Sequence, residues 1–256
     1  MEVSKGDLVF LSDVHLGGFD DPTNESIESD ALALIDYCRE NSLQLFILGD
    51  LFDYWMEYRG YSPPYGEKVL TAFEKFNKSQ NTLYITGNHD NWTGPRVEKA
   101  GFDVEHEYRI LDIGETKVML LHGDGIRDES YSLERPLLNR TLRNRWFLRV
   151  YQTMLPPALG VWLMRKFSGF SKKRSKGDKN CSLTMQKWAL EQLKEPNLDV
   201  IICGHFHKSR FIKNSDGLYI NIGNFYKHRT VGIYTKESFS LVTWDADNSK
   251  FVLQMQ

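Results

Sequence analysis

Short apolar runs recur along the chain, separated by polar and glycine-containing segments. Each run is four or five residues long, which is a length typical of a strand buried in a sheet. The predicted strands are Leu8–Leu11, Leu45–Leu48, Leu83–Thr86, Val118–Leu121, Val200–Cys203 and Leu218–Ile222. Between some of them, apolar residues three or four positions apart predict amphipathic helices. These helices are expected over Asp30–Asn41, with Ser29 or Asp30 as the cap, over Tyr65–Ser79 and over Thr184–Leu193.

Two further patterns predict antiparallel strands. Gly114-Glu115 separates Ile110–Ile113 from Lys117–Leu121, which indicates a hairpin. The tail from Thr230 to Met255 reads as more strands, with turns at Lys236–Glu237 and Asp245–Ser249. Because strands alternate with helices over much of the chain, the pattern favours a layered α/β fold.

Residues 125–190 interrupt this rhythm. They are basic, aromatic and helix-like, with a Pro156-Pro157 turn and a loop rich in Ser, Lys and Gly at Ser168–Lys179. We interpret residues 125–190 as a helical cap inserted into a core that is formed by residues 1–124 and 191–256. The apolar stretch Trp146–Phe167 is broken by arginines and prolines, so it is not expected to span a membrane.

Charge is distributed unevenly along the chain. The formal net charge is −2, but Arg135–Lys179 holds twelve lysines and arginines against one aspartate, about +11, which leaves about −13 elsewhere. Such a segment predicts an anionic partner. Its Leu, Met and Trp content favours an anionic membrane surface, so nucleic acid is not expected as a partner. The plainer interpretation, an amphipathic cap that only packs on the core, stays open.

The three cysteines, Cys38, Cys181 and Cys203, lie far apart and are odd in number. Disulfides are therefore not expected. We expect the cysteines to be small apolar residues of the core in a protein of the reducing cytoplasm. The beginning of the chain lacks the pattern of a secretory signal. We expect a monomer or a weak homodimer.

Side chains that can bind metals follow five of the predicted strands. They are Asp13 and His15 after the first strand, Asp50 after the second, Asn88, His89 and Asp90 after the third, His122 after the fourth, and His205 and His207 after the fifth. In open α/β sheets, sites form beyond the carboxyl ends of the strands. Buried polar groups also need partners, so five chance placements would be costly. Carboxylate, amide and imidazole ligands suit Mn, Fe or Zn better than Ca or a thiolate-bound metal.

In this order, the motifs Asp-x-His, Gly-Asp, Gly-Asn-His-Asp, His and Gly-His-x-His resemble those of the calcineurin-like metallophosphoesterase superfamily, from Leu8 to His207. The resemblance implies a four-layer α/β/β/α sandwich with a site for two divalent metal ions. It assigns Asp13, His15 and His207 to one metal, Asn88, His122 and His205 to the other, and Asp50 to both. It also places His89 against the phosphoryl group, with Asp90 able to orient it.

Two cations close together would lower the pKa of a bound water and hold the phosphoryl oxygens of an ester or anhydride. His89 would stabilise the charge that develops on those oxygens or protonate the leaving group. No cysteine or serine nucleophile is required.

The chain is also similar to the UDP-2,3-diacylglucosamine hydrolases in its length, in Gly49–Asp53, in His122–Asp124 and in its helical insertion. That resemblance implies an acylated UDP-sugar substrate, whose pyrophosphate is cleaved to lipid X and UMP at the cytoplasmic face of the inner membrane. It implies Mn²⁺ as the metal, although the ligands would accept Fe²⁺ or Zn²⁺. The substrate contacts that it suggests are Asn88, His89, Asp128, Ser171, Lys172, Arg174, Lys176 and His205.

One departure from this pattern affects the expected substrate. Many members of that family have Gly-Asn-Arg-Asp where this chain has Gly-Asn-His-Asp at residues 87–90. The alternative is therefore a soluble phosphodiesterase or phosphatase of the same superfamily that acts on a nucleotide or another phosphoester. A metal-stabilised binding protein without turnover is a third hypothesis, which the five intact motifs weigh against.

Overall fold

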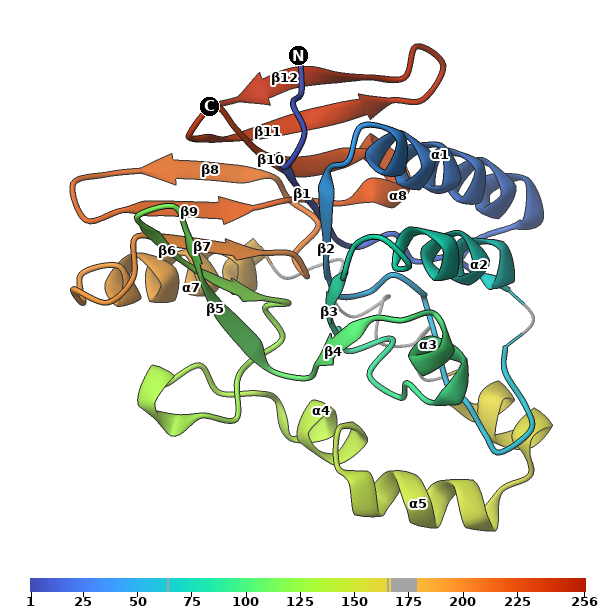
Figure 1. Cartoon of the computed structure of the whole chain (residues 1–256). Coiled ribbons are helices and arrows are strands. Elements are labelled where there is room, and N and C mark those ends of the chain that lie inside the picture. Colours follow the sequence, from blue (N-terminus) through green and yellow to red (C-terminus); the bar gives the residue numbers. More distant parts are fainter. Residues whose placement is uncertain (64, 165, 167–178) are drawn as a thin grey trace.

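Two β-sheets packed face to face organise the chain in the computed structural model (Figure 1). The structure describes residues 1–63, 65–164, 166 and 179–256. The larger sheet has seven strands in the order β12-β11-β10-β1-β2-β3-β4. Its strands are β1 (Leu8–Leu11), β2 (Gln44–Leu48), β3 (Leu83–Ile85), β4 (Asp103–Glu105), β10 (Thr230–Thr235), β11 (Ser238–Asp245) and β12 (Lys250–Met255). Because β1 to β4 pair in parallel, their carboxyl ends lie at one edge.

The second sheet has five strands in the order β5-β6-β7-β9-β8. Their bounds are β5 (Tyr108–Ile113), β6 (Thr116–Leu121), β7 (Val200–Cys203), β8 (Arg210–Lys213) and β9 (Leu218–Asn221). Strands β5 and β6 form the predicted hairpin, and β6, β7 and β9 run parallel. The ends of β6 and β7, which carry the fourth and fifth motifs, are therefore brought to one side.

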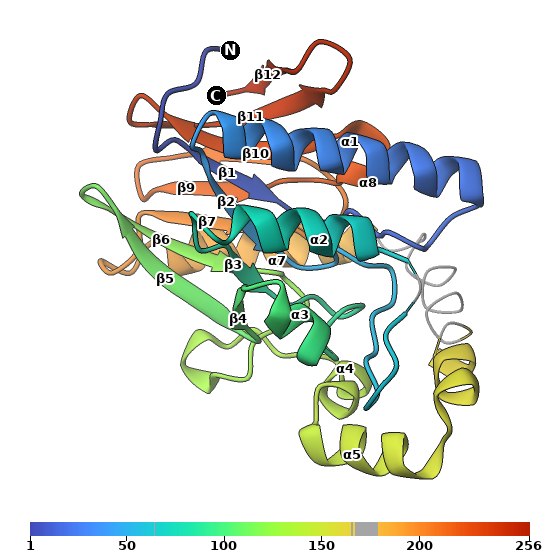
Figure 2. The same cartoon turned by 45° about the vertical axis from the view of Figure 1, so that its right-hand side comes forward.

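Helices cover the outer faces of both sheets (Figures 1 and 2). The first sheet packs against α1 (Asp21–Glu40), α2 (Glu67–Phe76) and α3 (Pro95–Lys99), and the second against α7 (Lys179–Gln192). A third apolar cluster, with Phe10 and Leu48 from one sheet and Leu120 and Ile202 from the other, fills the space between the sheets. The predicted α/β/β/α sandwich is therefore confirmed.

The cap lies beyond the sheets, at the end of the molecule away from both termini (Figure 2). It contains a 3₁₀ turn, η1 (Glu129–Tyr131), then α4 (Leu137–Leu142) and α5 (Arg145–Met154), and residues 157–164 are also helical. α4 lies between α5 and the sheets. In the described part of the chain, no helix is long and apolar enough to cross a lipid bilayer. The division into core and cap at residues 125 and 190 stays a prediction; α7, which begins within that range, packs on the second sheet.

The six predicted strands are all present, and so are the strands and turns of the tail. The predicted start of the first helix is wrong, because α1 begins at Asp21 rather than at Asp30. Asp20 is the cap: its carboxylate accepts a hydrogen bond from the backbone N–H of Thr23 at 2.9 Å, and Pro22 suits the first turn. Those first turns lie partly beyond the core, so they carry little of the apolar periodicity that predicts a helix. Cys38 and Cys203 are buried in the core, as expected.

Candidate metal centre

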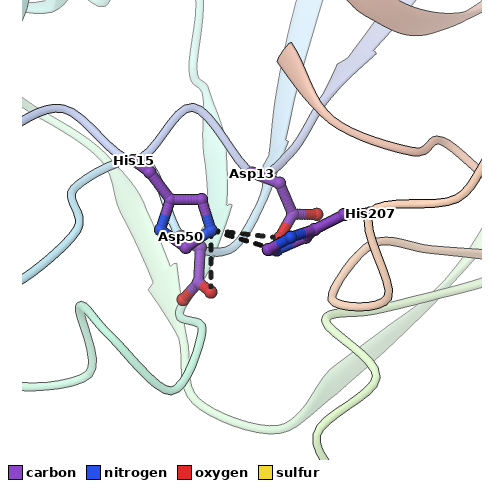
Figure 3. A group of neighbouring side chains, drawn as sticks. All are labelled: Asp13, His15, Asp50 and His207. Atoms are coloured by element: carbon purple, nitrogen blue, oxygen red, sulfur yellow. Dashed lines mark hydrogen bonds and ion pairs between the residues drawn. The ribbon is translucent and has the colours of Figure 1, made fainter. Parts of the chain in front are cut away.

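The loops that follow β1, β2 and β7 bring four side chains together (Figure 3). Nε2 of His15 lies 3.6 Å from a carboxylate oxygen of Asp13 and 3.6 Å from one of Asp50. Nε2 of His207 lies 3.0 Å from the same Asp13 oxygen and 3.1 Å from Nε2 of His15. The atoms that could bind a cation therefore point at one common position.

A second group also adjoins Asp50 and faces the same Oδ2 atom as His15 does. Nε2 of His122 is 3.4 Å from Oδ2 of Asp50 and 3.3 Å from the amide oxygen of Asn88. Nδ1 of His205 is 3.2 Å from Nε2 of His122. The structure thus brings all seven predicted ligands together in two groups, with Asn88 joined to the second through its contact with His122, and the carboxylate of Asp50 belongs to both.

The geometry of these residues fits a cation. The Oδ1 atom of Asp13 is buried and makes no well-formed hydrogen bond, although the ring nitrogens of His15 and His207 face it. A buried oxygen left in this way is costly unless another group binds it. Hard oxygens beside neutral imidazoles are the ligands preferred by first-row divalent metals. The assignment of each residue as a metal ligand is our proposal.

Strained backbone carries most of these ligands. Asp13, His15, Asp50, His205 and His207 all have positive φ, between 53° and 71°. Asp and His adopt this left-handed region more readily than most residues, but each position still costs on the order of 1–3 kcal/mol. Such conformations cluster at functional sites, because the surrounding structure holds side chains where a ligand needs them.

Two glycines of the motifs allow neighbouring chains to approach closely. A Cβ at Gly87 would collide with the carboxylate of Asp50, and one at Gly204 would collide with Ser12 and Asp13. Glycine at these positions therefore lets the loops after β3 and β7 pack directly on the ligands that follow β1 and β2.

The ring nitrogens that face away from the centre are held by the protein. Nδ1 of His15 lies 3.1 Å from Oδ1 of Asp53, and Nδ1 of His122 lies 2.8 Å from the carbonyl oxygen of Leu48. Partners of this kind fix the tautomer and orientation of metal-binding histidines. Asp53 belongs to the Gly49–Asp53 motif, which by itself assigns no role to this residue. Its position three residues after Asp50, just past a strand end, was the available signal.

His89 and Asp90 have different surroundings. The Nδ1 atom of His89 donates to the carbonyl oxygen of Asp53 at 2.6 Å, and the ring packs edge-on against that of His15. The carboxylate of Asp90 instead accepts bonds from the backbone N–H groups of Leu51 and Gly87, at 2.6 and 2.7 Å. Asp90 therefore ties the loop of Asp50 to that of His89, and the ring of His89 is oriented through Asp53.

Charges within the centre perturb each other strongly. Burial by itself would lower the pKa of His15 and of His122, but neighbouring carboxylates outweigh it and raise these pKa values to about 9 and about 10. The pKa of Asp50 lies well below its usual range, since nearby histidines outweigh the effect of burial. Burial and the charge of His122 lower the pKa of His205 to about 4.

Metal binding is expected to release protons and to strengthen as the pH rises. In the metal-free protein at pH 7, His15 and His122 are protonated, because their folded-state pKa values of about 9 and about 10 lie above that pH. The two cations together would displace about two protons, one from each histidine, so their apparent affinity should increase from pH 6 to about pH 10. Calorimetric titration in two buffers with different ionisation heats measures this release. Binding at pH 7 without proton release would contradict the prediction.

The remaining predicted contacts lie elsewhere or outside the described residues. Asp128 is exposed, caps η1 and accepts a hydrogen bond from the hydroxyl of Tyr108 at 2.9 Å. Its contact with substrate stays a prediction. Ser171, Lys172, Arg174 and Lys176 lie outside the residues that the structure describes.

Several curated proteins that resemble this chain over most of its length are named UDP-2,3-diacylglucosamine hydrolases. It is 29% identical over 241 residues to the UDP-2,3-diacylglucosamine hydrolase of Blochmanniella pennsylvanica, which covers 90% of this chain and 88% of that protein. It is 26% identical over 220 residues to the enzyme of that name from Porphyromonas gingivalis, with 78% and 82% covered. Among solved structures, the E. coli phosphoesterase Yfce shares the fold, with a TM-score of 0.50 and 16% identity over 97% of this chain and 98% of its own.

A family model for calcineurin-like phosphoesterases matches residues 7–209. The match spans all five motifs and therefore every residue of the two groups around Asp50. The chain accordingly belongs to the calcineurin-like phosphoesterase family and is a metal-dependent hydrolase of phosphoric esters or anhydrides.

Proposed function

We propose that the protein hydrolyses the pyrophosphate bond of UDP-2,3-diacylglucosamine to 2,3-diacylglucosamine 1-phosphate (lipid X) and UMP, using two divalent ions, with Mn²⁺ the first choice. The observation that carries this proposal is the length of the similarity to the hydrolases of that name, which covers about nine tenths of both chains in the Blochmanniella pennsylvanica comparison. The shared carboxylate of Asp50 supports the use of two ions.

Each part of the centre has a role in such a reaction. When bound, two divalent ions would lower the pKa of a water molecule and withdraw charge from the phosphoryl oxygens. Asp50 would be a ligand common to both groups, since its carboxylate faces both His15 and His122. His89 donates through Nδ1 to the carbonyl of Asp53, so Nε2 is the ring atom that would donate to a phosphoryl oxygen when the ring is protonated.

Apolar residues on the side of the cap that faces the core support the proposal of an acylated substrate. Tyr54, Met56, Trp92, Val161 and Met164 form an apolar cluster between the cap and the core loops. A pocket of about 10 Å³ in this region, which has room for roughly one water molecule and not for an acyl chain, is lined by Tyr54, Trp55, Asn88, His89, Asn91, Trp92, Leu142 and Met164. Apolar side chains therefore adjoin the residues that would face the phosphoryl group, and the cap would have to move for acyl chains to bind among them.

Exposed apolar and basic residues on the outer side of the cap support the proposal that it contacts an anionic membrane. Trp146 and Met154 on α5 are 74% and 76% exposed, and Leu137 on α4 is 79% exposed. The guanidinium of Arg149 lies 5.6 Å from the centre of the Trp146 ring. An apolar helix face with arginines alongside is a common interfacial design, and it would place the protein at the cytoplasmic face of the inner membrane.

Replacing Trp146 and Met154 by glutamate should weaken binding to vesicles about tenfold or more, a change of ~1.4 kcal/mol for each tenfold. The reason is that both the inserted apolar surface and the attraction to anionic lipid would be reduced. Sedimentation with vesicles of anionic phospholipid measures the effect. Leu183→Glu on α7, where Leu183 is also exposed, is the matched control. Equal vesicle binding by both variants would argue against a membrane face on the cap.

The proposed reaction is tested by incubating the purified protein and Mn²⁺ with UDP-2,3-diacylglucosamine. We expect UMP and lipid X in equal amounts, no product in the presence of a chelator, and much slower cleavage of a UDP-sugar without acyl chains. No UMP, together with cleavage of a generic phosphodiester, would favour the soluble phosphodiesterase or phosphatase. The Gly-Asn-His-Asp motif makes that comparison necessary.

A further inference from the structure

The cap is joined to the core by a buried arginine. Arg143 is the C-terminal cap residue of α4, and its side chain is only 7% exposed. Its Nε and Nη2 atoms lie 3.1 and 3.0 Å from the two carboxylate oxygens of Asp124, whose side chain is 2% exposed. This is the paired geometry in which a guanidinium binds a carboxylate most specifically.

The same guanidinium also binds the loop that follows β3. Nη2 donates to the carbonyl oxygen of Thr86 at 3.0 Å, and Nη1 donates to the hydroxyl of Thr86 at 3.2 Å. Nη1 further donates to the carbonyl oxygen of His106 at 2.8 Å. Three of its acceptors are thus parts of the core near the ends of β3 and β4.

These partners are close in sequence to two of the proposed metal ligands. Thr86 is two residues before Asn88, and Asp124 is two residues after His122. The ring of His122 lies 3.3 Å from the amide oxygen of Asn88. The side chain of Arg143 therefore contacts the loops that follow β3 and β6. These two loops must keep their relative position for Asn88 and His122 to meet.

The other group of ligands is supported by different contacts. Nδ1 of His15 faces Asp53, and the amide of Asn224 donates to the carbonyl oxygen of His207 at 2.9 Å. The backbone of Asp13 accepts bonds from the N–H groups of Phe225 and Tyr226. These supports come from the core, so they do not depend on the docking of the cap.

We propose that Arg143 is a positioning residue through which docking of the cap completes the metal site of Asn88, His122 and His205, while the site of Asp13, His15 and His207 forms without it. This inference rests on the proposed use of two ions. It gives the cap a second task besides binding the substrate: an undocked cap would leave the centre with one well-formed metal site.

The test is a titration of the full-length, metal-free protein with Mn²⁺, followed through the electron paramagnetic resonance signal of the unbound ion. The wild type should bind two ions. Arg143→Met should bind the first with little change and the second about 10–100-fold more weakly, the usual loss when a group that supports a metal ligand is removed. Arg143→Lys keeps the charge but cannot form the paired contact, so we expect an intermediate loss.

Two controls separate this effect from a general loss of stability. Arg140→Met removes an exposed arginine from the same helix and should bind both ions as the wild type does. Circular dichroism checks that each variant is folded, and Arg143→Lys carries the measurement if Arg143→Met does not fold. Asp124→Asn should show the same selective loss from the core side.

Two ions bound by Arg143→Met with wild-type affinities, or an equal weakening of both, would overturn the inference. A wild type that binds a single ion would overturn it together with the proposed two-ion centre. If the wild type binds two ions but releases no UMP from UDP-2,3-diacylglucosamine, the proposed substrate is wrong, and the inference about Arg143 is decided by the titration alone.

Discussion

Asp50→Asn is expected to lose most of its bound metal and to reduce turnover about a thousandfold or more. One carboxylate lies within 3.6 Å of Nε2 of His15 and within 3.4 Å of Nε2 of His122, so both groups of ligands lose a charged member at once. Two cations supply several kcal/mol of transition-state stabilisation, and every 1.36 kcal/mol is about tenfold in rate.

Asparagine is chosen because it keeps the shape of this buried side chain. The Oδ1 atom of Asp50 accepts a bond from the backbone N–H of His89 at 3.0 Å, and an amide oxygen can keep that bond. Metal content is measured by elemental analysis after gel filtration, and turnover by release of UMP. Asp112→Asn, at an exposed aspartate of β5, is the matched control. A variant with two ions bound and near wild-type turnover would rule out Asp50 as the shared ligand.

His89→Asn is expected to reduce kcat about 100- to 1,000-fold while both metal ions stay bound. The ring lies beside that of His15 but belongs to neither group around Asp50, and its Nδ1 atom is held by the carbonyl of Asp53. Its loss removes a donor to the charge that develops on the phosphoryl oxygens, a contribution of about that size in other enzymes.

Comparing kcat with metal content separates the role of His89 from that of a ligand. His89→Arg restores a permanent cation, so it should recover activity to within about tenfold of the wild type and lose the pH dependence that a histidine imposes. His228→Asn, at an exposed histidine of α8 (Phe225–His228), is the control. Loss of metal from His89→Asn, or unchanged kcat, would contradict the assigned role.

The strands of the core were predicted well because each one is marked by a run of apolar residues within its own few positions. The apolar runs that form β1, β2, β3, β6, β7 and β9 stand out, since a strand covered on both faces has few polar positions. Strands β4 and β8 were not predicted. Each is an edge strand of its sheet, and its residues are partly buried or exposed and carry no continuous apolar run.

The roles of supporting residues were harder to predict. Asp124 and Arg143 are ordinary charged residues in the sequence, and nothing in their spacing indicates that they pair with each other. Arg143 was counted only as one of the basic residues of the cap, yet its charge is turned inward against Asp124. A count of charges cannot distinguish an arginine that faces solvent from one that is paired inside, because the partner lies 19 residues away in the chain.

Patterns in the sequence were sufficient to predict the layered α/β class, the order of the strands that carry motifs, and the seven side chains placed at the ends of those strands. Those features follow from the period of apolar residues and from the high cost of burying polar groups without partners. The division of the seven into two groups around Asp50 was implied by the family resemblance, and the packing of the two sheets shows how these distant residues come together. The attachment of the cap to two of their loops became visible only in the folded structure. Both depend on distances between residues far apart in the chain, which are set by how sheets and helices pack together.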